Sequence, residues 1–152
     1  MTRLSAIVAA AAVVAVVWHA GAGALAEEMP ATRPANPKVP AIRELTVAAK
    51  ETVFGKSSWD KPLVLKSAKE AGEFFAEEEL AKLVKDVNFD QQVVLVFAWH
   101  GSGGDKLTHA VAESYPEQVM FKYSRGRTKD LREHVLVFAL RSNVTWQVMA
   151  LQ

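Results

Sequence analysis

The sequence contains no cysteine, and it shows no excess of either charge. Without cysteine, the chain cannot form disulfides, thiolate-ligated zinc or iron–sulfur sites, or an acylated-cysteine lipid anchor. Its 18 Lys and Arg residues are balanced by 17 Asp and Glu residues, whereas nucleic-acid-binding surfaces usually show a clear basic excess. We therefore expect no nucleic-acid partner, and no motif in the chain predicts a cofactor.

The chain also lacks an apolar run long enough to cross a bilayer. After Arg3, the uncharged stretch over residues 4–17 has about 14 residues, whereas a membrane-spanning helix needs about 20. Residues 24–26 read Ala-Leu-Ala, and a basic start, an apolar centre and an A-x-A end are typical of a secretory signal peptide. We expect cleavage after Ala26, a secreted or periplasmic location and no stable membrane insertion afterwards. The alternative is an uncleaved anchor.

Proline is concentrated in one segment. Four of the six prolines lie in residues 27–40, and because proline fixes φ and removes a hydrogen-bond donor, we expect an extended linker there. Residues 41–152 are then expected to form a single domain. The residues after the leader hold 17 basic and 17 acidic side chains, so the mature chain is neutral and depends on its core for stability.

Helical and strand patterns in residues 41–152 predict an α+β domain. Ser67 and Glu70 have the spacing of a capping box at the start of a helical region that extends to about residue 87. Two segments are apolar at consecutive positions, which is typical of strands buried on both faces; they are residues 93–99 and 135–140. Further strands are expected at about 42–54, 62–66, 118–123 and 144–149.

Residues 105–115 decide the topology. As a strand, this segment follows a four-residue glycine-rich loop and pairs back on residues 93–100, with His100 opposite Asp105. As a helix, it completes a βαβ unit over residues 93–123 and makes the fold α/β. We favour the hairpin, which predicts a mainly antiparallel sheet of about five to six strands with one or two short helices on one face.

Two loops hold the candidate binding residues. The first is Gly101, Ser102, Gly103 and Gly104, which matches no dinucleotide fingerprint, P-loop or nucleophile elbow; a turn between strands also explains its glycines. The second spans residues 124–134 and contains Arg125, Arg127, Lys129, Arg132 and His134. Guanidinium groups suit carboxylate or phosphate. The alternative is a solvated loop whose arginines pair with nearby acids.

The remaining candidates are histidines and one tryptophan. His100, Asp105 and His109 are metal-ligating residue types, and only the helical alternative brings Asp105 and His109 to i, i+4 positions. Ser102 with a histidine and an aspartate would be the elements of a hydrolase. Trp59 lies in a loop before Pro62 and is the tryptophan most suited to contact a ligand.

Residues 87–111 combine Val-Asn-Phe-Asp at 87–90, an apolar strand that follows, and Gly103-Gly104 at the entry to the next strand. In these features the segment resembles the C-terminal domain of the bacterial PrcB-type protease-complex subunit. The resemblance implies an accessory or interaction role outside the cytoplasm, with no catalytic residues. We therefore expect a non-catalytic binding domain for a protein or acidic ligand; the alternative is a small metal-dependent or Ser/His hydrolase that uses residues 100–109.

Overall fold

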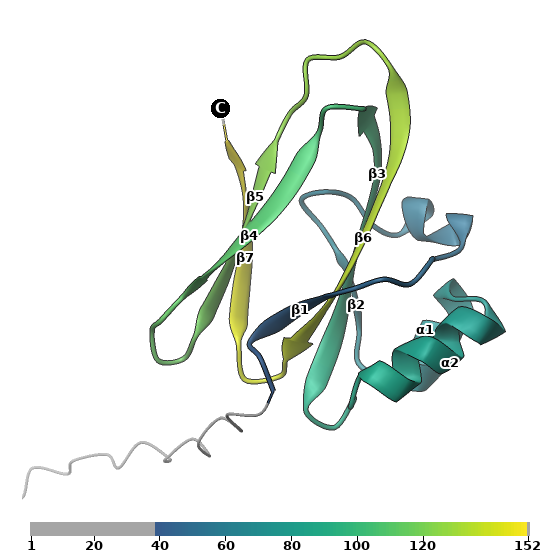
Figure 1. Ribbon diagram of the computed structural model, residues 1–152, viewed down its shortest axis with the longest axis vertical. Coiled ribbons are helices and arrows are strands. Elements are labelled where there is room, and N and C mark those ends of the chain that lie inside the picture. Colours follow the sequence, from purple (N-terminus) through teal and green to yellow (C-terminus); the bar gives the residue numbers. More distant parts are fainter. Residues whose placement is uncertain (1–38, 152) are drawn as a thin grey trace, which may run out of the picture. The chain divides into compact units, whose positions relative to one another are not determined.

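The computed structural model describes residues 39–151 of the chain. The expected signal peptide and residues 27–38 of the expected linker lie outside the described residues. The described part contains β1 (Ile42–Leu45), η1 (Glu51–Gly55), β2 (Leu63–Leu65), α1 (Ala68–Phe74), α2 (Glu77–Asp86), β3 (Gln92–Ser102), β4 (Lys106–Ala112), β5 (Gln118–Ser124), β6 (Leu131–Arg141) and β7 (Thr145–Leu151). This composition confirms the α+β class (Figure 1).

The strands form two sheets. The four-stranded sheet has the order β1-β6-β3-β2 and is antiparallel throughout, and the three-stranded sheet has the order β4-β5-β7. In the smaller sheet, β4 and β5 are antiparallel, whereas β5 and β7 are parallel. The longest ladder joins β3 to β6 over all eleven residues of each strand, from Gln92 opposite Arg141 to Ser102 opposite Leu131.

The larger sheet is covered on both faces, which explains why β3 and β6 are apolar at consecutive positions. One face packs against the helical segments, where Val94, Val96 and Ala98 share a buried cluster with Phe75 and Leu83. The other face packs against the smaller sheet in a second buried cluster, which contains Leu95, Phe97, Val119, Phe121 and Phe138. The prediction of two strands buried on both faces is confirmed.

Residues 105–115 form a strand over Lys106–Ala112, so the βαβ alternative over residues 93–123 is wrong. The hairpin partner predicted for this strand is also wrong, because β4 pairs with β5 and not with β3. One edge of β3 pairs with β6 along its full length, and β2 occupies the other edge at Val94–Val96, inside the segment predicted to pair with β4. Leu107 is buried between exposed Lys106 and Thr108, and this alternation suits a sheet with one face toward solvent.

Two further boundaries and the position of the last strand in the sheets differ from the predicted ones. The opening strand ends at Leu45, and Glu51–Gly55 is a 3-10 helix instead of its continuation. β6 begins at Leu131, inside the segment predicted as a loop, because Leu131–Val135 pair with β3. After the turn at residues 142–143, β7 does not return to β6; it joins the smaller sheet beside β5.

The helical region has the predicted start. The Ser67 hydroxyl accepts a hydrogen bond from Glu70 N at 3.2 Å, and the Glu70 carboxylate accepts one from Lys66 N at 2.8 Å. The serine cap is the predicted one, whereas the Glu70 carboxylate bonds to Lys66 N, one residue before the Ser67 N of a capping box. Helix α2 follows directly, with three glutamates in its first turn and Lys85 in its last turn, as the helix dipole favours.

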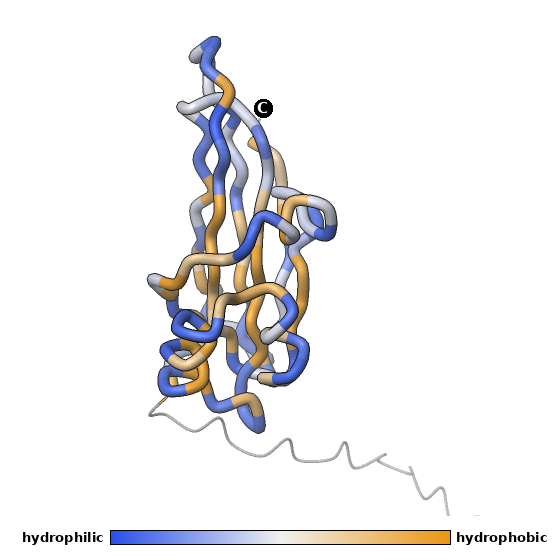
Figure 2. Tube along the Cα trace, turned by 90° about the vertical axis from the view of Figure 1, so that its right-hand side faces the viewer, coloured by the Kyte–Doolittle hydropathy of each residue, from blue (hydrophilic) through white to orange (hydrophobic). Residues whose placement is uncertain are grey.

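Within residues 39–151, no helix is both long enough and apolar enough to cross a bilayer. The apolar stretches lie along the strands, whereas the β5–β6 loop at the upper end is hydrophilic (Figure 2). This polar end holds the candidate site described next.

Candidate functional site

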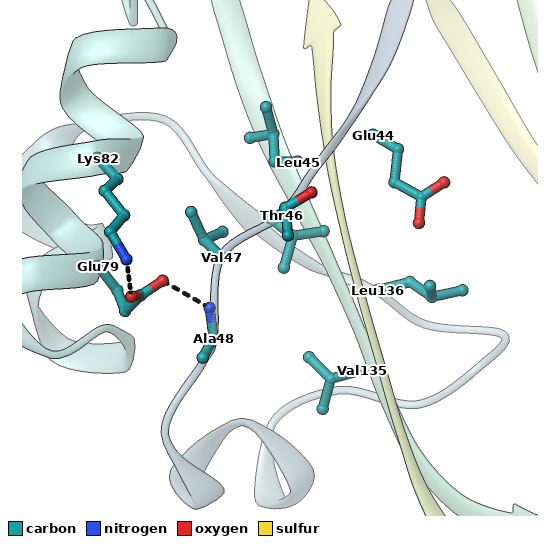
Figure 3. Close-up of a pocket in the computed structure, with 10 residues that line it drawn as sticks. Glu44, Leu45, Thr46, Val47, Ala48, Glu79, Lys82, Val135 and Leu136 are labelled. Atoms are coloured by element: carbon teal, nitrogen blue, oxygen red, sulfur yellow. Dashed lines mark hydrogen bonds and ion pairs between the residues drawn. The ribbon is translucent and has the colours of Figure 1, made fainter.

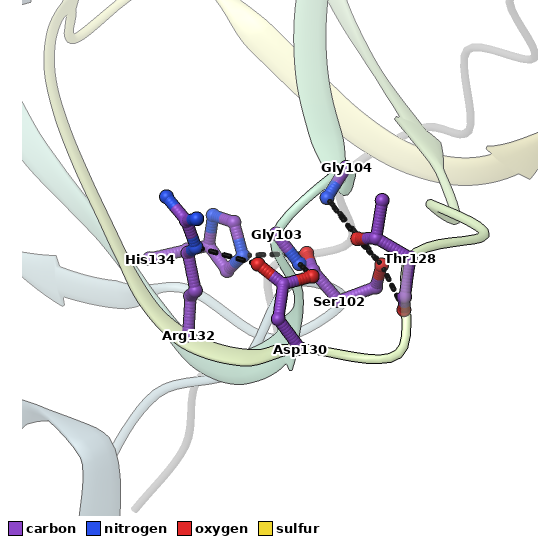
Figure 4. Close-up of polar contacts among 7 residues, drawn as sticks. All are labelled: Ser102, Gly103, Gly104, Thr128, Asp130, Arg132 and His134. Carbon is purple, nitrogen blue, oxygen red and sulfur yellow. Dashed lines mark hydrogen bonds and ion pairs between the residues drawn. The ribbon is translucent and has the colours of Figure 1, made fainter.

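The two loops predicted separately as binding segments lie against each other in the fold. The first, predicted at residues 101–104, is the end of β3 and the β3–β4 turn (residues 103–105). The second, predicted at residues 124–134, is the β5–β6 loop (residues 125–130) with the adjoining ends of β5 and β6. Gly104 N donates to Thr128 Oγ1 at 3.1 Å, and Gly103 N donates to Asp130 Oδ1 at 3.2 Å (Figure 4). The long β3–β6 ladder leads both segments to this end of the larger sheet, so the two candidate loops form one surface.

The side chain of Asp105 connects the β5–β6 loop to the strands by hydrogen bonds. Its side chain is buried and accepts three hydrogen bonds, from Trp99 Nε1 at 3.1 Å, from the Tyr123 hydroxyl at 2.8 Å and from Gly126 N at 2.7 Å. The three donors come from β3, from β5 and from the loop itself. Because carboxylate acceptors make strong hydrogen bonds, this single residue ties the loop to both sheets.

The environment of Asp105 keeps it ionised. Burial by itself would raise the pKa of this carboxyl, but the hydrogen bonds from Gly126, Tyr123 and Trp99 outweigh burial and lower its pKa below the ordinary value. Burial, followed by the contact with the Asp105 carboxylate, raises the pKa of Tyr123 to about 12. Asp105 is therefore a charged acceptor and Tyr123 a neutral donor at neutral pH.

The loop approaches the turn so closely that one of its residues must lack a side chain. A Cβ added at Gly126 would lie 2.3 Å from the carbonyl carbon of Gly104 and 2.6 Å from Asp105 N. A Cβ at Gly101 would meet Asp105 Oδ2 at 2.1 Å. These glycines permit close packing of backbone against backbone and against the anchor carboxylate.

A second carboxylate holds the outer part of the loop. The hydrogen bonds from Thr128, Arg132 and Gly103 lower the pKa of exposed Asp130 to about 2. Arg132 Nε lies 2.6 Å from Asp130 Oδ2, so this arginine forms an ion pair within the site. Arg132, one of the four predicted cationic residues, is therefore already partnered and helps to order the loop.

Beside this surface is a cavity of about 1130 Å³. Aromatic side chains and residues of the cationic loop both line this cavity. The indole of Trp59 stacks on the Tyr123 ring, with the two ring centroids 4.2 Å apart. The lining residues that matter for binding are Trp59, Trp99, Tyr123, Arg125, Arg127 and Lys129. Of the predicted loop glycines, Gly101 lines the cavity together with Ser102, whereas Gly103 and Gly104 lie in the β3–β4 turn and are not among its lining residues.

Three cations of this cavity have no acidic partner among residues 39–151. Arg125, Arg127 and Lys129 are exposed, and none of them forms an ion pair with another described residue. Asp105 and Asp130 also line this cavity, but their carboxylates are engaged by the hydrogen bonds and the Arg132 ion pair described above, so the three cations are not paired with them. Two arginines and a lysine that line a cavity together with aromatic side chains can bind a carboxylate or phosphate group.

The contacts of Ser102 and His134 are those of a structural pair. Ser102 Oγ donates to the Thr128 carbonyl at 2.9 Å and contacts Thr128 Oγ1 at 2.7 Å. His134 Nε2 lies 2.9 Å from the backbone oxygen of Ser102, not from its hydroxyl, and its ring stacks on Trp99. Among residues 39–151, no imidazole hydrogen-bonds to the Ser102 hydroxyl, as nucleophilic catalysis requires.

The three residues of the predicted metal alternative have different surroundings. His100 lies 3.5 Å from Glu133 on β6 and packs on Phe54, Asp105 is engaged with its three donors, and His109 packs on Phe121 and Phe138. Among the described residues, no group of three or more His, Asp or Glu side chains could hold a metal ion.

A smaller cavity of about 510 Å³ lies between β6, helix α2 and the segment that follows β1 (Figure 3). There the Glu79 carboxylate accepts from Lys82 Nζ at 2.6 Å and from Ala48 N at 2.9 Å. The bond from Lys82, followed by that from Ala48, lowers the pKa of Glu79, and the same ion pair raises the pKa of Lys82. In this cavity the two charged groups are paired with each other, and Glu79 holds Ala48 against α2. The larger cavity, which has cations without an ion pair, is therefore the better candidate for binding.

Sequence reasoning named the cationic loop and Trp59 but missed the anchor that joins them. Asp105 was a candidate metal ligand, whereas its role in the fold is to accept hydrogen bonds from β3, β5 and the loop. The local signal was an aspartate directly after two glycines, followed 21 residues later by another glycine. No spacing rule connects such distant residues before their strands are placed.

Comparison with known proteins identified no relative: no family model, no curated protein and no solved structure matches this chain. What the site can do therefore follows from its own geometry and chemistry.

Proposed function

We propose that this protein is a non-catalytic binding domain that takes an anionic ligand, or an acidic segment of a protein partner, at the cavity beneath the β5–β6 loop. The observation that carries the proposal is the group of three cations without an ion pair among residues 39–151, Arg125, Arg127 and Lys129, in a cavity that Trp59 and Tyr123 also line. Exposed cations attract an anion over several ångströms, and guanidinium forks then fix its orientation.

The rigid support of the loop favours binding over a merely solvated surface. Asp105 and Asp130 hold the backbone of the loop at Gly126 and at the β3–β4 turn, so the cationic side chains project from an ordered segment. Ordering before binding reduces the entropy lost when a ligand is immobilised. The neutral total charge of residues 27–152 makes this local cluster a distinctive feature.

The proposed setting is the periplasm or the exterior of the cell. The leader pattern of residues 1–26 supports export. The resemblance of residues 87–111 to the PrcB-type domain supports an accessory role there. Export and an accessory role outside the cytoplasm are therefore part of this proposal, together with the anionic partner.

Titration with hexaglutamate tests the proposal, with tryptophan fluorescence as the readout because Trp59 and Trp99 line the cavity. We expect saturable binding that weakens as salt is added, since ion pairs at an exposed site are screened. The double variant Arg125→Ala/Arg127→Ala should bind about tenfold or more weakly, which corresponds to about 1.4 kcal/mol, and should show a shallower salt dependence.

The matched control is Lys66→Ala/Lys69→Ala, which removes the same charge from exposed positions at α1, away from the cavity. It should bind hexaglutamate like the unchanged protein. Equal weakening in both double variants would show attraction to total charge alone. That result, or an absence of binding by the unchanged protein, would contradict the proposed site.

A further inference from the structure

The two sheets have four edge strands among residues 39–151, namely β1, β2, β4 and β7, and the first three are protected. β1 has only four residues, of which Arg43 and Glu44 are charged. β2 has only three residues and follows Pro62. The open part of β6, beyond the end of β1, contains Arg132 and Glu133, and β4 contains Lys106 and His109. Shortness, proline and charge are the features that prevent an exposed edge from pairing with another chain.

The edge of β7 has none of these protections. Its seven residues are Thr-Trp-Gln-Val-Met-Ala-Leu at 145–151, with no charge, no proline and no glycine. Met149 is 36% exposed and Leu151 is 49% exposed, so apolar surface accompanies the open backbone. A long, uncharged, partly apolar edge strand favours addition of a further strand.

The ladder to β5 shows which backbone groups of β7 face outward. Thr145 N donates to Glu117 O at 3.1 Å, and in a parallel ladder the residues that bond to one neighbour alternate with those that face away. Odd-numbered residues of β7 therefore bond to β5. The N–H and C=O groups of Trp146, Val148 and Ala150 point away from the sheet.

We propose that β7 pairs antiparallel with β7 of a second copy of this chain, about a two-fold axis at Val148. In this register Val148 faces its own copy and Trp146 faces Ala150, so the three outward-facing residues of each strand meet one another. They form up to about six interchain hydrogen bonds. Gln147 faces Met149 of the second copy, and no like charges meet in the ladder.

A second copy fits this edge better than it fits the others. Two-fold pairing places a strand opposite itself, so a charged edge such as β6 would bring Arg132 or Glu133 near its own copy, which costs stability. On β7 that penalty is absent, and two-fold dimers are the commonest protein assemblies. The product is one continuous six-stranded sheet made from two β4-β5-β7 sheets.

Sedimentation velocity of the purified protein over about 10 to 500 µM tests the proposal, a range suited to a small interface. We expect a monomer–dimer equilibrium in the unchanged protein. Gln147→Lys/Met149→Lys places lysines opposite lysines across the axis and should weaken the dimer at least tenfold. Both positions are exposed, and circular dichroism checks that the variant remains folded.

A second variant tests the register itself. Gln147→Lys/Met149→Glu adds the same number of charges but places each introduced lysine opposite an introduced glutamate of the other copy, so the dimer should be retained. Thr108→Lys, on the β4 edge, should leave association unchanged. A monomer at all concentrations, equal dimers in both double variants, or an effect confined to Thr108→Lys would overturn the proposal.

Discussion

At the scale of single residues, Asp105 has the largest structural role at the candidate site. It is a buried charge that is compensated by hydrogen bonds instead of by an opposite charge, with donors from Trp99, Tyr123 and Gly126. A buried carboxylate is tolerated only when such partners are present. The residue therefore stabilises the fold and positions the cationic loop at once.

We predict that Asp105→Asn lowers the free energy of unfolding by about 2–4 kcal/mol at pH 7, because several bonds to a charged acceptor weaken and an amide hydrogen meets a donor. The folded-state pKa of Asp105 lies below its unfolded value of about 3.9. Its contribution is therefore complete above about pH 4 and is lost as the pH falls through the folded-state pKa.

Urea unfolding at pH 7 and pH 3 measures this difference. The difference in the free energy of unfolding between the unchanged protein and Asp105→Asn should be smaller at pH 3 than at pH 7. Asp90→Asn, which removes one charge from an exposed position, should change stability by less than about 0.5 kcal/mol. A gap of the same size at both pH values would contradict the assigned role of Asp105.

At the scale of elements, the site depends on how closely the β5–β6 loop approaches the β3–β4 turn. The helices and strands themselves were largely predictable, because capping residues and apolar periodicity act locally. Their partners were not: β4 alternates in polarity whether it pairs with β3 or with β5. Only the occupation of both β3 edges by β2 and β6 excluded the predicted hairpin.

Gly126→Ala tests this close approach. An added Cβ would collide with the Gly104 backbone at 2.3 Å, so the loop must move; we expect a loss of about 1–3 kcal/mol of stability and weaker hexaglutamate binding. Gly55→Ala is the matched control, because no atom lies within 4 Å of its added Cβ. Similar losses in thermal unfolding for both variants would refute the steric explanation.

At the scale of the whole described fold, one ion pair links the two sheets. Arg141 ends β6 in the larger sheet, and its buried guanidinium contacts the carboxylate of Glu117, which directly precedes β5 in the smaller sheet. Arg141 N also donates to Ala41 O at 3.1 Å beside β1. This pair therefore joins three segments at the end of the molecule opposite the candidate site.

We predict that Glu117→Gln destabilises the protein by about 1–3 kcal/mol, because it leaves a buried guanidinium without its carboxylate. Arg141→Met combined with Glu117→Gln should cost less than the sum of the two single changes, since the double variant has no buried charge to compensate. Urea unfolding of the four proteins completes the cycle. Strictly additive costs would show that the two side chains do not interact.

The sequence by itself determined the features that depend on neighbouring residues: the leader pattern, the start of α1, the doubly apolar strands β3 and β6, the α+β class and the cationic loop. Tertiary structure alone decided that the strands divide into two sheets, that residues 101–104 meet residues 125–130, and that Asp105 joins them. These contacts link residues far apart along the chain. Many pairings satisfy the same local patterns, and only the packing of the complete core selects among them.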